Sequence, residues 1–229
     1  VSKMRASIYV LGPLLARLKE AKVSFPGGCA IGTRPIDLHL QAMEALGAHI
    51  SVDFGYINAR TDALQGNDIY FSKSSVGATI NALMAAVLAK GKTRIFNAAM
   101  EPEVDSTVDL LNKMGAKITG RETTTLEIEG VAELFPVEMT IIPDRIEAGT
   151  FLIAGALSNN PVTVANCEPA HLSAVLKKLR EAGCEMEMED KAITVIPPAS
   201  IKPVNLMTLP YPGFPTDLQA QFTVLMSLA

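Results

Sequence analysis

Apolar residues follow the same spacing in three separate stretches of the chain. The stretches begin at Ile36, Val104 and Leu172, and in each one apolar residues recur at positions i, i+4, i+7 and i+10. This spacing places the apolar side chains on one face of an α-helix. We therefore predict three amphipathic helices, each ending before a glycine that can adopt the left-handed conformation of a helix C-cap. These glycines recur at intervals of 68 residues, at Gly47, Gly115 and Gly183.

The elements around these helices repeat at the same interval. Each predicted helix is followed by two extended runs and preceded by a short strand, before which lies a helix of small residues. Coincidental similarity within an ordinary α/β domain is the alternative, but five matched columns at one spacing argue against it. The sequence therefore predicts an α/β fold of repeats of about 68 residues. Residues 216–229 resemble the first helix of a fourth repeat.

A change of pattern separates the second repeat from the third. Residues 137–146, which precede Glu147, contain Pro143 followed by the charged residues Asp144 and Arg145, and they show no helical period. We place a domain boundary near residue 142, so that residues 1–142 carry two repeats and residues 143–229 carry one repeat and the start of another. The chain does not begin with Met, and it ends within the fourth repeat. We therefore expect a fragment of a longer protein, truncated at both ends.

The composition of the chain argues against nucleic acid and membranes as partners. The net charge of −4 gives no overall positive field to attract nucleic acid or anionic lipid, and 5% aromatic residues without Trp leave few stacking platforms. No apolar run approaches the ~18 residues of a membrane span, and the first residues do not resemble a signal peptide. Three cysteines without paired spacing favour reduced thiols, and hence a cytoplasmic location.

The loop over residues 24–35 is the most unusual stretch of the first repeat. It is longer than the matching loops of the other repeats and holds Cys29 among three glycines, with Arg34 at the start of the next helix. A lone cysteine is often a small buried hydrophobe. An exposed thiol beside a cation would instead be a reactive one, and the residues alone leave both readings open. Cys167 and Cys184 lack such a setting.

Three further places could bind anions or hold a catalytic group. Residues 73–79 open a small-residue helix with a lysine, two serines and a glycine, which form a modest anion cradle or simply a helix cap. Arg5 and Arg34 are either anion ligands or ordinary surface charges. Asp217, which follows a proline-rich turn, either caps its helix or serves as a general base. The three histidines offer no metal-ligand spacing, so we expect no metal site.

Five stretches of the chain together resemble one protein family: MRAS, PGGCAIGTRPIDLHL, KSSVGAT, PDRIEAGTF and FPTDLQAQF. The family is that of the enolpyruvyl transferases, and within it the UDP-N-acetylglucosamine 1-carboxyvinyltransferases. The resemblance implies two domains, each an inside-out α/β barrel of three βαβαββ repeats, with the active site between them. It also implies transfer of the enolpyruvyl group of phosphoenolpyruvate to the 3-hydroxyl of UDP-N-acetylglucosamine, with release of phosphate, in peptidoglycan synthesis.

The resemblance assigns a role to each candidate residue. Cys29 would be the general acid that protonates phosphoenolpyruvate, and the residue that fosfomycin alkylates, whereas Asp217 would be the general base near the sugar hydroxyl. Arg5 and Arg34 would be cations at the phosphate and nucleotide-sugar site. Two segments would hold the UDP moiety: Arg34, Pro35, Ile36, Asp37 and Leu38, and Lys73, Ser74, Ser75 and Val76. No cofactor is implied.

Two functions other than UDP-N-acetylglucosamine enolpyruvyl transfer are the alternatives for this sequence. A 3-phosphoshikimate 1-carboxyvinyltransferase shares the fold, but it does not resemble the cysteine loop or the segment TRPIDLHL. A non-catalytic paralogue that binds UDP-sugar is the alternative from a different class. Because several segments of the family have no counterpart in these 229 residues, we expect that the isolated chain does not turn over.

Overall fold

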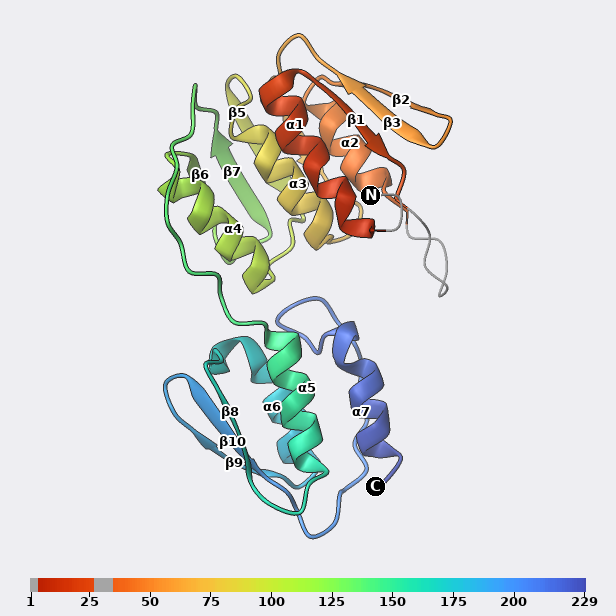
Figure 1. Cartoon of the computed structure of the whole chain (residues 1–229), viewed down its shortest axis with the longest axis vertical. Helices are drawn as coiled ribbons and strands as arrows, with labels where there is room; N and C mark the ends of the chain where they lie inside the picture. Colours follow the sequence, from red (N-terminus) through yellow and green to blue (C-terminus); the bar gives the residue numbers. More distant parts are fainter. Residues whose placement is uncertain (1–3, 27–34) are drawn as a thin grey trace. The chain divides into compact units, whose positions relative to one another are not determined.

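The computed structural model describes residues 4–26 and 35–229, and of Arg5 the backbone alone. The chain forms two compact units, Val1–Met139 and Thr140–Ala229, here called the first and second domains (Figure 1). The division lies close to the boundary that the sequence predicts near residue 142.

The first domain contains two repeats. The first repeat consists of the 3-10 helix η1 (Arg5–Val10), α1 (Leu11–Leu18), β1 (Glu20–Ser24), α2 (Asp37–Ala45), β2 (His49–Asp53) and β3 (Tyr56–Arg60). The second consists of β4 (Asp68–Tyr70), α3 (Val76–Ala86), β5 (Lys92–Phe96), α4 (Pro102–Lys113), β6 (Lys117–Thr119) and β7 (Thr125–Glu129). The predicted order of helix, strand, helix, strand, strand is confirmed in both, and in the second the additional strand β4 completes the βαβαββ pattern.

The second domain begins with a third repeat. Its elements are α5 (Arg145–Ala156), β8 (Val162–Ala165), the 3-10 helix η2 (Pro169–Leu172), α6 (Ser173–Glu181), β9 (Glu185–Met188) and β10 (Ala192–Ile196). A long connection then leads to the 3-10 helix η3 (Thr216–Leu218) and to α7 (Gln219–Met226). The helix expected over residues 216–229 is therefore present, although its first turn is a 3-10 helix.

The three sheets share one strand order. In β1–β3–β2 and β8–β10–β9, all neighbours are antiparallel and the last strand of the repeat lies between the other two. The sheet β4–β5–β7–β6 has the same order, with β4 added parallel to β5 at the edge. Because an identical order recurs in three segments, the repeat read from the apolar pattern is a repeat of topology as well.

The helix ends behave as the repeat predicts. Gly47, Gly115 and Gly183 have φ angles of 89°, 102° and 104°, which are left-handed conformations that favour glycine. In each repeat the chain leaves the amphipathic helix through this residue and enters the next strand directly. The glycines thus confirm the C-caps expected from the sequence.

Helix α3 occupies the centre of the first domain and packs against α1, α2 and α4 (Figure 1). Most of its buried residues are small, and they permit close helix contacts. A Cβ on Gly12 of α1, for example, would lie 2.5 Å from the backbone oxygen of Asn81 in α3. Helices therefore meet helices in the interior, whereas each sheet keeps an exposed face, as the alternating burial along β7 indicates.

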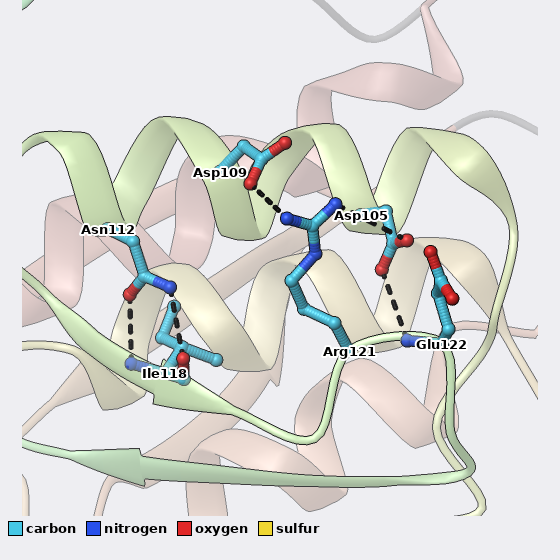
Figure 2. Close-up of polar contacts among 6 residues, drawn as sticks. All are labelled: Asp105, Asp109, Asn112, Ile118, Arg121 and Glu122. Carbon is cyan, nitrogen blue, oxygen red and sulfur yellow. Dashed lines mark hydrogen bonds and ion pairs between the residues drawn. The ribbon is translucent and has the colours of Figure 1, made fainter.

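Side chains of α4 tie the β6–β7 turn to the helix (Figure 2). The Asn112 amide donates to the carbonyl oxygen of Ile118 at 3.0 Å and accepts from its backbone N–H at 2.9 Å. Arg121, in the turn, forms ion pairs with Asp105 and Asp109, and all three side chains reach solvent. The amide therefore satisfies two backbone groups at the start of β6, while the ion pairs are screened by water.

This difference predicts unequal stability effects. Asn112→Ala is expected to lower the free energy of unfolding by about 1–2 kcal/mol, because two half-buried backbone groups lose their partner. Arg121→Gln is expected to lower it by less than about 1 kcal/mol, because exposed ion pairs contribute little. Denaturant unfolding of both variants measures the difference. A larger loss in Arg121→Gln than in Asn112→Ala would contradict this account.

Candidate active site

The segment Pro35–Leu38 forms the entry to α2. The helix begins at Asp37, whose side chain is exposed in the first turn, and the buried side chains of Ile36 and Leu38 anchor the segment in the core. The N-cap residue, Ile36, has an apolar side chain that cannot cap the helix, and its carbonyl oxygen accepts from the N–H groups of His39 and Leu40. An uncapped helix start is favourable for anions, because its first N–H groups carry a partial positive charge.

The segment Lys73–Val76 forms the entry to α3. Ser75 is the N-cap, and its Oγ accepts from the backbone N–H of Ala78 at 3.3 Å, so the capping role considered for this serine is confirmed. Ser74 is half-buried and Lys73 is exposed. The lysine thus places a cation beside a helix N-terminus, a combination that suits a phosphate group.

Three residues bring these two helix starts together. Tyr9 of η1 and His39 of α2 have ring centroids 6.1 Å apart at an angle of 79°. A Cβ on Gly77, in the first turn of α3, would lie 2.9 Å from Tyr9 Oη and 3.1 Å from His39 Nε2. The entries to α2 and α3 therefore lie at the same end of the first domain.

The start of α4 lies near the same end. Thr79, in the first turns of α3, accepts through Oγ1 from the backbone N–H of Ala99 at 3.1 Å, and Ala99 lies just before α4. Several helices thus direct their N-termini towards one region, which makes it a favourable place for an anionic ligand.

The sequence indicates Gly77 as part of the anion cradle over residues 73–79, but it does not indicate Tyr9 or His39 as parts of this arrangement. His39 is packed, with only 6% of its surface exposed. A signal was present, because His39 directly follows the segment Pro35–Leu38 and Gly77 directly follows Lys73–Val76. Only the contact between the two positions identifies them as one cluster.

Asp217 lies in the second domain, on η3, and its side chain is exposed. The N-cap of η3 is Pro215 and that of α7 is Leu218, and neither helix start has a side-chain cap bond. Capping, the alternative role considered for this carboxylate, is therefore not realised.

The starts of α5 and α7 lie side by side in the second domain. Gln221 Nε2 of α7 donates to Thr150 Oγ1 of α5 at 3.0 Å. The Arg145 guanidinium at the start of α5 lies 5.6 Å from the ring centroid of Tyr211, in the turn before η3. Asp217 therefore belongs to a group of helix starts that resembles the one in the first domain.

Several candidate residues fall outside the described part of the chain. Cys29 and Arg34 lie between residues 27 and 34, and the side chain of Arg5 is also outside the description. Within residues 4–26 and 35–229, no group of three or more His, Cys, Asp or Glu side chains is arranged to hold a metal ion. In the same residues, no helix has the length and apolar character that crossing a membrane requires.

The two other cysteines are packed in the second domain. Cys167 and Cys184 are free thiols with 2% and 5% of their surfaces exposed. Burial raises the pKa of both thiols, because the thiolate loses its hydration. Neither has the exposed cationic setting of a reactive cysteine, as expected from the sequence.

Comparisons with known proteins find relatives that match the whole of this chain. Curated relatives named UDP-N-acetylglucosamine 1-carboxyvinyltransferase are 57% identical over 229 residues in Desulfosudis oleivorans and 55% identical over 231 residues in Chloroherpeton thalassium. Both alignments cover 100% of this chain but 55% and 54% of the relatives, so the chain spans about half of their length.

Solved structures share the fold. The enolpyruvyl transferase NikO from Streptomyces tendae matches 97% of this chain and 54% of its own, with a TM-score of 0.81 and 22% identity. An EPSP synthase from Acinetobacter baumannii matches 88% of this chain and 48% of its own, with a TM-score of 0.64 and 18% identity. The predicted α/β fold of the enolpyruvyl transferase type is therefore confirmed. Because a family model for EPSP synthase (3-phosphoshikimate 1-carboxyvinyltransferase) matches residues 1–229, the chain belongs to this family.

Proposed function

We propose that the full-length protein transfers the enolpyruvyl group of phosphoenolpyruvate to the 3-hydroxyl of UDP-N-acetylglucosamine and releases phosphate. The observation that supports this most strongly is the 57% identity, over the whole chain, to a relative that carries this enzyme's name. The solved EPSP synthase, by contrast, is 18% identical.

The charge distribution of the first domain supports anionic substrates. Both proposed substrates carry phosphate groups, and the chain as a whole is negative, so local positive charge must bind them. The starts of α2 and α3 supply partial positive charge, and Lys73 and Arg34 supply full charges. We assign residues 34–38 and 73–76 to the UDP moiety, and Arg5 and Arg34 also to the phosphate-bearing groups.

Two residues carry the proton transfers in the proposed reaction. Cys29 gives its thiol proton to the methylene carbon of phosphoenolpyruvate, while the sugar 3-hydroxyl adds to the neighbouring carbon and gives its proton to Asp217. The product of this addition is a tetrahedral ketal. In the elimination the new methyl group returns a proton to the Cys29 thiolate, which restores the double bond, and phosphate leaves with the proton that Asp217 accepted. The acid must lie beside phosphoenolpyruvate and the base beside the sugar 3-hydroxyl, so the addition requires both Cys29 and Asp217.

Location and inhibition follow from the same proposal. We further propose that the reaction takes place in the cytoplasm. It would be the first committed step of peptidoglycan synthesis. Fosfomycin, an epoxide, would alkylate Cys29, because a thiol close to a cation such as Arg34 in the sequence is favoured as a thiolate nucleophile. No cofactor takes part in the proposed reaction.

A phosphate-release assay on the full-length protein tests the proposal. Release is expected with phosphoenolpyruvate and UDP-N-acetylglucosamine, and none above background when shikimate 3-phosphate replaces the nucleotide sugar. The opposite preference would identify a 3-phosphoshikimate 1-carboxyvinyltransferase, and binding of UDP-N-acetylglucosamine without release would identify a non-catalytic paralogue. The 229-residue chain alone is expected to be inactive.

A further inference from the structure

A single buried amide connects four helical elements of the first domain. Asn81 of α3 has no exposed surface. Its Oδ1 accepts from the backbone N–H of Gly12 in α1 at 2.8 Å, and its Nδ2 donates to the carbonyl oxygen of Ile8 in η1 at 3.1 Å. The same Nδ2 lies 3.1 Å from Nδ1 of His39 in α2. One side chain on α3 therefore contacts all the helical elements of the first repeat.

The backbone partners determine which way the amide points. Gly12 offers an N–H, so the atom facing it must be the oxygen, and Ile8 offers a carbonyl, so the atom facing it must be the nitrogen. The reversed amide would place donor against donor and acceptor against acceptor at two buried contacts. The close approach needs Gly12, because a Cβ there would lie 2.5 Å from Asn81 Oδ1.

This orientation in turn determines the tautomer of His39. Because Asn81 Nδ2 is a donor, His39 Nδ1 must accept, and the ring proton is then on Nε2. Nε2 lies beside the first turn of α3, 3.1 Å from the point that a Cβ on Gly77 would occupy. The ring thus directs an N–H donor to the place where the starts of α2 and α3 meet.

We propose that Asn81 is a positioning residue, which acts through His39 to align the starts of α2 and α3 for an anionic nucleotide-sugar. Its effect reaches both segments assigned to the UDP moiety, since His39 adjoins Leu38 and Gly77 adjoins Val76. The ligand part of this inference rests on the proposed function, whereas the tautomer and the helix alignment do not.

Asn81→Asp tests the proposal with an almost unchanged shape. The carboxylate still accepts from Gly12, but it sets an oxygen against the Ile8 carbonyl and requires a proton on His39 Nδ1. Nitrogen-15 NMR of the imidazole is expected to report a proton on Nε2 alone in the unaltered protein, and a proton on Nδ1 in the variant. The Kd for UDP-N-acetylglucosamine is expected to rise by about tenfold or more, since buried polar groups lose their partners.

Asn112→Asp is the matched control. This amide also bonds two backbone groups, but it does so at the C-terminal end of α4, beside Ile118. The control is expected to lower stability while the His39 signals and the Kd stay unchanged. Hydrogen exchange is expected to quicken over residues 36–40 and 76–80 in Asn81→Asp and not in the control.

Two results would overturn the proposal. One is a proton on His39 Nδ1 in the unaltered protein, a measurement that needs no variant and no ligand. The other is an Asn81→Asp variant that keeps both the unaltered exchange rates and the unaltered Kd. If the unaltered full-length protein binds no UDP-N-acetylglucosamine, the proposed function fails, while the tautomer and the exchange rates still decide whether Asn81 aligns the helices.

Discussion

Replacing Cys29 with serine in the full-length protein is expected to lower kcat for phosphate release by about 100-fold or more, the usual contribution of a general acid. The hydroxyl of serine is a much weaker acid than a thiol, so it cannot protonate the methylene carbon of phosphoenolpyruvate at neutral pH. The substitution changes one atom of the side chain, so the binding of UDP-N-acetylglucosamine, measured separately by calorimetry, is expected to persist.

The repeats supply a control for this substitution. Cys184 stands where the other two repeats have Ala48 and Ala116, so Cys184→Ala restores the residue that the same position tolerates elsewhere. Its thiol is buried and its pKa is raised by that burial, so it takes no part in the proposed chemistry. The control is expected to keep full activity, and fosfomycin is expected to add its mass to Cys29 alone. A Cys29→Ser variant with unaltered kcat would remove the cysteine from the mechanism.

Gly130→Ala is expected to lower the free energy of unfolding by about 3 kcal/mol, near the upper end for overpacking. Gly130 follows β7, and its N–H donates to the carbonyl oxygen of Gly91 at 2.9 Å. A Cβ at this position would lie 1.6 Å from the backbone oxygen of Ala89 and 2.8 Å from its carbonyl carbon. The clash is with main chain, which cannot rotate away as a side chain can, so the two segments must separate.

Gly47→Ala distinguishes this clash from the general cost of replacing glycine. Gly47 has a φ of 89°, but a Cβ there would meet nothing within 4 Å. Its replacement is expected to cost only the strain of a left-handed residue, about 1–2 kcal/mol. Denaturant unfolding, together with hydrogen exchange over β5 and β7, measures both variants. Equal losses in the two would show that the close approach at Gly130 relaxes freely.

The apolar pattern predicted much of the fold because it records local geometry. Residues such as Leu40 and Leu176 repeat at the helical period, and the glycines after each helix need a left-handed backbone whatever surrounds them. The apolar pattern did not indicate strand β4, which only the βαβαββ repeat of the family implies, because three residues are too few for a periodic signal and its pairing partner β5 lies across a helix in the sequence. The 3-10 first turns of α1, α6 and α7 were also not distinguished from α-helix.

Some parts of the candidate site were predictable from the sequence, and others were not. The entries to α2 and α3 were found from their residues and from the family resemblance, and the capping role of Ser75 was already one of the alternatives. The Asn81 network was not found, because its partners His39, Gly12 and Ile8 are 42, 69 and 73 residues away. No pattern within one helix distinguishes Asn81 from an ordinary polar residue.

The sequence by itself determined the repeat, the helix ends, the two-part organisation and the family. These properties depend on neighbours a few residues apart, or on motifs that are contiguous in the chain. Tertiary structure alone decided that α3 is surrounded by helices, that the starts of α2 and α3 meet, and that the Asn81 amide lies against His39. Those properties depend on close approaches and buried hydrogen bonds between distant segments, which form only when the apolar faces of the helices pack together.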